Sequence, residues 1–273
     1  MGRRAALVLV LVAVIAGSAV AALRHRPLPG SEKPRLTPLA GTTEGLATGR
    51  TDLQGATKTL SARLAENPAD GGAAARLAEI YLRRTRVDGT GGYAVEAERV
   101  LTEVLRREPG DYNALRAIGA VYLSQHRFSE AAASARRAIA VRPRDAWNFG
   151  VLGDALVELG DHERGFDAFD TMVRMRPDAA SYARVAYAQE LQGRIPDALR
   201  SMRMAAEATS PRDAESLAWH HAQIGDLLVR TGDRDEAARE FARAEFIFPG
   251  HPDAAAGRAR LAAGADAAIR QSK

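Results

Sequence analysis

The side chains that most often carry chemistry are scarce in this sequence and poorly grouped. The chain has no cysteine, which excludes disulfides, thiolate catalysis and cysteine-ligated metals. Of its six histidines, His220 and His221 are adjacent, so they point to different sides of a helix and cannot hold one metal together. The glycine-rich stretch 89–92 lacks the Lys-Ser or Lys-Thr of a phosphate-binding loop, and neither an H-E-x-x-H nor a nucleophile-elbow pattern occurs. We therefore expect no enzyme, no cofactor and no metal site.

Two short patterns combine the residue types that anchor protein interfaces. In each, a tryptophan is followed by an aspartate seven residues later and by a charged residue four positions further on: Trp147, Asp154 and Glu158, and then Trp219, Asp226 and Arg230. Seven residues are about two helical turns, so each set shares one stripe of a helix. Trp, Tyr and Arg are frequent interface anchors, and the stripes therefore predict recognition of another protein. Packing of the tryptophans against a neighbouring helix, and simple solvation of the carboxylates, are the alternatives.

Prolines mark the elements that position these stripes. Six of them recur along the chain, and the middle four are 34 residues apart: Pro68, Pro109, Pro143, Pro177, Pro211 and Pro249. Between them, apolar residues follow helical spacing. Ala and Leu, the best helix formers, are abundant, so the composition also favours an all-α protein.

Matched residues recur with the same period. Each first helix has a bulky residue followed by a small one: Leu77-Ala78, Ile118-Gly119, Leu152-Gly153, Val185-Ala186 and Ile224-Gly225. Each second helix has a small residue where the two helices cross: Ala97, Ala131, Gly165, Ala198 and Ala237. A larger side chain follows four residues later in Leu101, Phe169, Met202 and Phe241, with Ala135 as the exception. The turn between the helices holds Gly160, Gly193 and Gly232, which suit a positive φ, and His126 takes this place in the second repeat.

Two helices in 34 residues, with these columns, resemble the tetratricopeptide repeat. The resemblance covers about two thirds of the chain and gives five repeats, near 70–109, 111–143, 145–177, 178–211 and 213–249. It implies an all-α, right-handed α-solenoid of five helix pairs, with capping helices at about 52–66 and 253–270. Extra residues around Asp88–Gly92 predict a flexible loop inside the first repeat.

Members of this family commonly hold peptides or helices of their partners on a concave face, which is lined by the first helix of each repeat. The resemblance therefore implies a groove on that face. The candidate groove residues are Asn113, Arg116, Trp147, Asp154, Glu158, Arg184, Tyr187, Glu190, Trp219, Asp226 and Arg230. The partner is a protein or a peptide, and the sequence does not identify it.

The N-terminal segment is typical of a membrane anchor. Residues 5–23 carry no charge, and 19 helical residues span about 28 Å, close to the hydrocarbon thickness of a bilayer. The alternative is a signal peptide cleaved near Ala21, because Ala19-Val20-Ala21 fits the small-x-small pattern. Arginines flank both ends, so charge does not fix the orientation. A short cytoplasmic tail is the commoner arrangement, and we expect a single-pass protein with the repeat domain, 51–270, on the extracytoplasmic side.

Residues 24–50 are rich in proline and show no apolar period, which predicts a disordered linker. The first 35 residues carry a net charge of +5 and the remainder a net charge of −1. The basicity of the chain belongs to its N-terminal segment, and a nucleic-acid binder should carry its basic patch on the folded domain. We therefore expect no nucleic-acid partner.

The sequence as a whole predicts a non-catalytic scaffold or adaptor of the cell envelope, which binds a peptide or helix of a partner in its groove. An N-terminal anchor followed by such repeats resembles bacterial membrane-anchored tetratricopeptide repeat proteins. That resemblance implies a role in the assembly of an envelope complex. The alternative is a structural protein that forms homo-oligomers through its ends or outer faces.

Overall fold

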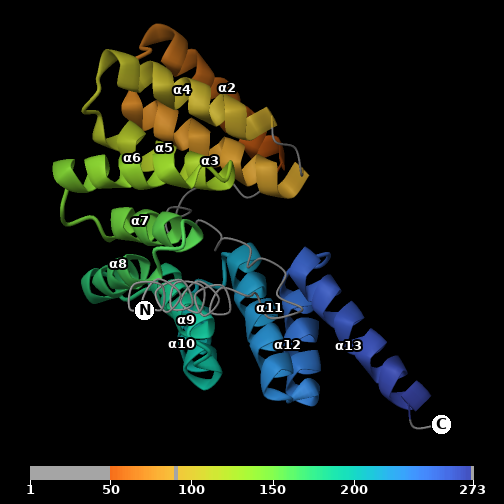
Figure 1. Ribbon diagram of the computed structural model, residues 1–273. Coiled ribbons are helices and arrows are strands. Elements are labelled where there is room, and N and C mark those ends of the chain that lie inside the picture. Colours follow the sequence, from red (N-terminus) through yellow and green to blue (C-terminus); the bar gives the residue numbers. More distant parts are fainter. Residues whose placement is uncertain (1–49, 89–91, 272–273) are drawn as a thin grey trace, which may run out of the picture. The chain divides into compact units, whose positions relative to one another are not determined.

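The computed structural model describes residues 50–88 and 92–271, which form twelve α-helices and no strand (Figure 1). The helices are α2 (Arg50–Glu66), α3 (Gly71–Asp88), α4 (Gly92–Arg107), α5 (Tyr112–Ser124), α6 (Phe128–Val141), α7 (Ala146–Glu158), α8 (His162–Met175), α9 (Ala179–Leu191), α10 (Ile195–Glu207), α11 (Ala214–Thr231), α12 (Arg234–Ile247) and α13 (Pro252–Gln271). The predicted all-α solenoid of helical repeats is confirmed. The predicted membrane segment and linker lie outside the described residues. Among the described helices, none is long and apolar enough to cross a membrane.

The helices pack in five successive pairs: α3 with α4, α5 with α6, α7 with α8, α9 with α10 and α11 with α12. The second helix of each pair also contacts the first helix of the next pair. At the two ends, α2 packs on α3, and α13 packs on α11 and α12. Each pair thus covers a face of its neighbour, and the two outer helices cover the terminal pairs.

Large rings set against glycines hold the paired helices close together. Phe169 of α8 is fully buried, and a Cβ added to Gly153 of α7 would lie 2.4 Å from its Cε1 atom. Phe241 of α12 is packed in the same way against Gly225 of α11, where the corresponding distance is 2.7 Å. A methyl group at either glycine would overlap the ring, so the small residue predicted in these columns is a requirement of the packing.

Aspartates begin seven of the described helices, and one of them is Asp70 before α3, which accepts a hydrogen bond from the Ala73 N–H at 2.9 Å. Asp111, Asp145, Asp161, Asp178, Asp213 and Asp233 each accept a hydrogen bond from a backbone N–H of the first turn. Asp111, Asp145 and Asp213 each follow a repeat proline by two residues. Proline cannot continue the preceding helix, and the aspartate starts the next one, which explains why the prolines mark the period.

The first repeat differs from the predicted one. Its first helix, α3, has 18 residues, against 13 in α5, α7 and α9. Residues 82–88 contain no glycine or proline that would stop the helix, so most of the extra residues extend α3. Asp88 and Gly92 of the predicted loop are helical, and residues 89–91 lie outside the described range.

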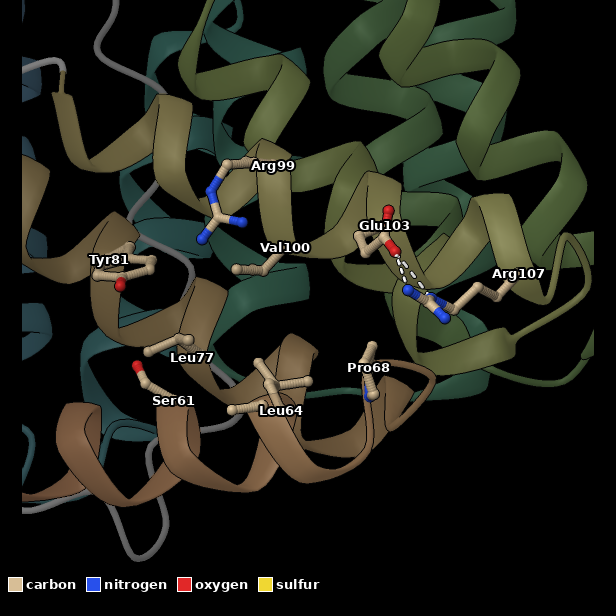
Figure 2. Close-up of a pocket in the computed structure, with 10 residues that line it drawn as sticks. Ser61, Leu64, Pro68, Leu77, Tyr81, Arg99, Val100, Glu103 and Arg107 are labelled. Atoms are coloured by element: carbon tan, nitrogen blue, oxygen red, sulfur yellow. Dashed lines mark hydrogen bonds and ion pairs between the residues drawn. The ribbon is translucent and has the colours of Figure 1, made fainter.

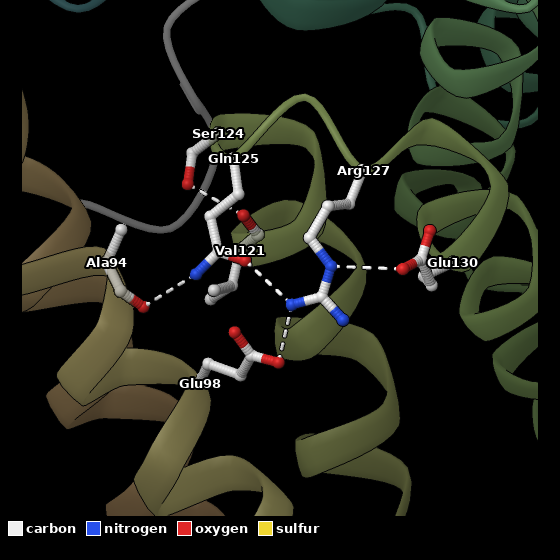
Figure 3. Close-up of polar contacts among 7 residues, drawn as sticks. All are labelled: Ala94, Glu98, Val121, Ser124, Gln125, Arg127 and Glu130. Atoms are coloured by element: carbon white, nitrogen blue, oxygen red, sulfur yellow. Dashed lines mark hydrogen bonds and ion pairs between the residues drawn. The ribbon is translucent and has the colours of Figure 1, made fainter. Parts of the chain in front are cut away.

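In the turn of the second repeat, a histidine has the positive φ that glycine usually adopts. His126 has a φ of 59°, close to the 84° of Gly160 and the 75° of Gly193 in the same turn. Figure 3 shows how the flanking residues hold this turn against α4. Gln125 Nε2 donates to the Ala94 carbonyl at 3.2 Å, and Arg127 Nη1 donates to Glu98 at 2.6 Å.

Replacing His126 by glycine is expected to raise the free energy of unfolding by about 0.5–1 kcal/mol. The left-handed region costs a side-chain-bearing residue roughly 1–2 kcal/mol, and the greater freedom of glycine in the unfolded chain offsets part of this gain. Urea unfolding measures the difference. The matched control, Gly160→Ala, should lower stability, because it places a side chain at a φ of 84°. A destabilising His126→Gly would contradict this account.

Candidate functional site

The predicted groove residues lie in two clusters and at two separate positions. The interior cluster joins α5, α7 and α9 and comprises Arg116, Trp147, Asp154 and Arg184. The acidic cluster joins α7, α9 and α11 and comprises Glu158, Tyr187, Glu190 and Asp226, with Arg230 paired to it. Asn113 is exposed on α5, and Trp219 is buried in α11.

A buried ion pair forms the centre of the interior cluster. Only 1% of the Arg184 side chain is exposed, and its guanidinium forks onto Asp154: Nε lies 3.0 Å from Oδ1 and Nη2 lies 2.7 Å from Oδ2. Arg184 Nη1 donates to the Ala180 carbonyl at 3.1 Å. Burial raises the pKa of Asp154, and Arg184 opposes that rise. The pair fastens the fourth repeat to the third inside the protein.

Trp147 packs on this pair. It is 7% exposed, and its ring lies 4.9 Å from the guanidinium carbon of Arg116 and 5.8 Å from that of Arg184. Arg116 is fixed in turn, since its Nε donates to Asp145 at 3.1 Å. The structure thus places Trp147 in the packing role, one of the two that the sequence allows, and little of its ring is accessible to a ligand.

Trp219 is also enclosed. It is 6% exposed and lies edge-on to His220, with ring centroids 5.2 Å apart. The Nδ1 atom of His220 lies 3.1 Å from Thr209 Oγ1, and burial lowers the pKa of His220 to about 3. The imidazole is neutral at physiological pH, and this region behaves as core.

The acidic cluster is more open. Tyr187 is half-buried, and its pKa is raised first by burial and then by the nearby carboxylates of Glu158, Asp154 and Glu190. Burial also raises the pKa of Glu190; Arg230 opposes this effect and Asp226 adds to it. Crowded carboxylates at a partly desolvated surface disfavour their own ionised forms, and such perturbed groups are typical of functional sites. The cluster therefore places negative charge beside a half-buried aromatic ring.

Two arginines partly neutralise the acidic cluster. Arg230 donates to Glu190, and Arg260 of α13 donates to Asp226. Their side chains remain 37% and 48% exposed, so both ion pairs are accessible from solvent. Sequence reasoning misses Arg260, although it follows Asp226 by 34 residues, which is one repeat period.

Replacing Glu190 by glutamine is expected to stabilise the protein at about pH 7, with a gain that disappears towards about pH 4. The pKa of Glu190 is higher in the folded than in the unfolded chain, so the wild-type protein gains stability as the pH falls through that folded pKa. The glutamine variant has no such gain. Urea unfolding across the pH range measures the difference, with Glu163→Gln on the exposed side of α8 as the control. A glutamine variant that is less stable at about pH 7 would show that the Arg230 pair outweighs the carboxylate repulsion.

Two depressions lie outside the two clusters, although Asp145 at the edge of the second one contacts Arg116 of the interior cluster. One, of about 430 Å³, lies between α2, α3 and α4 and is lined by the apolar Leu64, Leu77 and Val100 (Figure 2). At its edge Arg107 pairs with Glu103 at 2.5 Å, and the arginines around Glu103 hold the pKa of this carboxyl at about 2. The other depression, of about 610 Å³, lies at the loops after α6 and α8. No predicted groove residue lines either one.

A family model described as tetratricopeptide repeat matches residues 96–147 and 151–214. These two segments resemble tetratricopeptide repeats. They contain the whole interior cluster and the acidic-cluster residues of α7 and α9. Tetratricopeptide repeats typically mediate protein–protein interaction and are a non-enzymatic type of scaffold. A comparison with curated protein sequences finds no match.

Two solved structures share the helical-repeat fold of this chain. One is a thermophilic tetratricopeptide repeat protein from Thermus thermophilus, with 22% identity and a TM-score of 0.54, covering 68% of this chain and 97% of that one. The other is the Cut9–Hcn1 hetero-tetramer of the APC/C, with 16% identity and a TM-score of 0.62, covering 77% of this chain and 40% of that one. At these identities the likeness concerns the fold alone.

Proposed function

We propose that this protein is a non-catalytic scaffold that binds a positively charged peptide or helix of a partner protein at its acidic cluster. The observation that carries the proposal is the grouping of carboxylates on three successive first helices: Glu158 and Glu190 lie near the half-buried Tyr187, and Asp226 lies near Glu190. A scaffold needs groups that gain interactions on binding. The residues of the interior cluster are buried or partly buried and already form hydrogen bonds and ring contacts with one another, so they offer little to a ligand.

A lysine or arginine side chain fits this cluster chemically. It would relieve the repulsion between Glu190 and Asp226, and it could lie against the ring of Tyr187. Arg230 and Arg260 already hold two of the carboxylates, so an incoming cation must share them or displace an arginine. Binding should therefore be moderate in affinity and should weaken with added salt.

Selection of peptides from a random library by the full chain tests this proposal. We expect the enriched sequences to contain lysine or arginine at a fixed position and to bind more weakly as the salt concentration rises. Enrichment of acidic or purely apolar sequences would contradict it. So would an affinity that does not respond to salt.

We further propose that residues 5–23 anchor the chain in the cell envelope with the repeat domain on the extracytoplasmic side, where it serves the assembly of an envelope complex. The uncharged run and the following Arg24-His25-Arg26 support this location. Cleavage near Ala21, which would release the domain, is the alternative. A reporter enzyme fused to the C-terminus should be active only outside the cytoplasm. Activity confined to the cytoplasm would overturn the proposed topology.

A further inference from the structure

We infer that the loop pocket, the depression of about 610 Å³ formed by the second and third repeats, is a docking site for an acidic segment of a partner protein. Its lining residues are Val141, Arg142, Pro143, Arg144, Asp145, Ala146, Met175 and Arg176. The pocket brings three guanidinium groups together with two exposed aliphatic side chains. It is separate from the acidic cluster and has the opposite charge.

The three arginines differ in how far they are engaged. Arg142 lies over the ring of Tyr112, 4.0 Å from its centroid, a contact that leaves its N–H donors available for hydrogen bonds. Arg176 is paired with Asp178 at 2.7 Å. Arg144 is exposed and makes no hydrogen bond or ion pair with the residues that the structure describes. Arg142 and Arg144 can therefore bind an incoming carboxylate, and Arg176 adds to the local positive potential.

The carboxylates nearby do not neutralise these two arginines. Asp145 accepts hydrogen bonds from the Tyr112 hydroxyl and from Arg116, and it also caps α7. Asp178 caps α9 and pairs with Arg176. Both acids are engaged in holding the helices, so the pocket keeps an excess of positive charge, and complementarity selects an anionic ligand.

The apolar part of the pocket favours a peptide over a membrane surface. Val141 is 47% exposed and Met175 is 37% exposed, at the ends of α6 and α8. A peptide with an aliphatic residue beside its acidic one would cover both side chains while reaching the arginines. Anionic membranes are typically bound by clusters of about 4–8 basic residues, and this group of three exposed arginines is smaller than that.

Fluorescence anisotropy with the full chain tests this inference, using a peptide of repeated Glu-Leu-Glu units as the probe. We expect saturable binding that Arg144→Glu weakens by about tenfold, because it sets like charge against the peptide. Arg239→Glu makes the same charge change at an exposed site on α12 and should leave the affinity within about twofold. The Gln-Leu-Gln version of the peptide should bind weakly or not at all.

Three outcomes would overturn the inference. They are equal losses in Arg144→Glu and Arg239→Glu, equal binding of the two peptides, and capture of phosphatidylserine vesicles through Arg144 without binding of the acidic peptide. The last outcome would assign the pocket to a membrane surface. Glu190→Gln should not weaken binding of the acidic peptide, so failure at the loop pocket can be told apart from failure of the function proposed for the acidic cluster.

Discussion

Replacing Arg184 by methionine is expected to lower the free energy of unfolding by about 3–5 kcal/mol. The substitution leaves Asp154, whose side chain is 7% exposed, as a buried carboxylate without its cation. Urea unfolding at about pH 7 measures the loss. An exposed pair is the control: Arg194→Met removes a partner of Asp197 and should cost less than about 1 kcal/mol.

The loss in the Arg184 variant should shrink as the pH falls. Burial raises the pKa of Asp154, and removal of Arg184 takes away the group that opposes this rise. A folded-state pKa above the unfolded one means that stability is lost as the pH rises through it, so the variant is least stable near neutrality and recovers in acid.

A second substitution separates two contributions to the free energy of unfolding: the destabilisation by an unpaired buried charge and the net stabilisation by the ion pair. The double variant Asp154→Leu with Arg184→Met should return to within about 2 kcal/mol of the wild type, because an apolar pair of similar size needs no partner for a charge. A single variant that is as stable as the wild type would contradict the buried geometry.

Replacing Trp147 by alanine is expected to cost about 3–5 kcal/mol of stability. The indole is 7% exposed and packs beside Arg116 and Arg184, so its removal opens a cavity next to the buried ion pair. The control is Phe246→Ala, because Phe246 is 86% exposed and should change stability by about 0.5 kcal/mol or less.

Trp147→Phe tests whether the ring serves packing or binding. It keeps an apolar ring in the core and should recover most of the stability lost in the alanine variant. If Trp147 packs as the structure shows, the phenylalanine variant should also bind the partner as the wild type does. Full stability together with lost binding would instead make the indole a ligand contact.

The repeat could be predicted from the sequence because its signals are local. A proline that stops one helix and an aspartate that caps the next lie within two residues of each other, as in Pro143 and Asp145. The small residues are also local signals, since Gly153 has to admit the ring of Phe169 wherever the two helices cross. Such features repeat with the period, and the helices follow from them.

The burial of the Trp147 stripe could not be predicted from the sequence. Helical spacing correctly puts Trp147 and Asp154 on one side of α7, but it cannot tell what covers that side. Arg184 of the next repeat reaches back over it, and this depends on how closely α7 and α9 approach. A Cβ at Gly150 would lie 3.1 Å from Arg184 Nε, so the absence of a side chain there makes room for the guanidinium. Burial of this kind depends on packing between repeats, which spacing along one helix does not encode.

The sequence predicts the residues of the acidic cluster as groove candidates, but it does not predict that they lie close together. Glu158, Tyr187, Glu190 and Asp226 were all candidates for the groove, yet nothing in their spacing separates them from the interior cluster. Their proximity arises from three successive first helices. The pairing of Arg260 with Asp226 depends in addition on the docking of α13 against α11.

Our proposal is that the acidic cluster binds a basic segment of a partner. It is tested most directly by comparing the affinity of one lysine-containing peptide for two matched triple variants of the full chain. The cluster variant carries Glu158→Gln, Glu190→Gln and Asp226→Asn, and the control carries Glu163→Gln, Asp167→Asn and Glu207→Gln at exposed positions of α8 and α10. We expect the cluster variant to lose at least about tenfold in affinity and the control to stay within about twofold of the wild type. Equal affinities of the two variants would contradict the account.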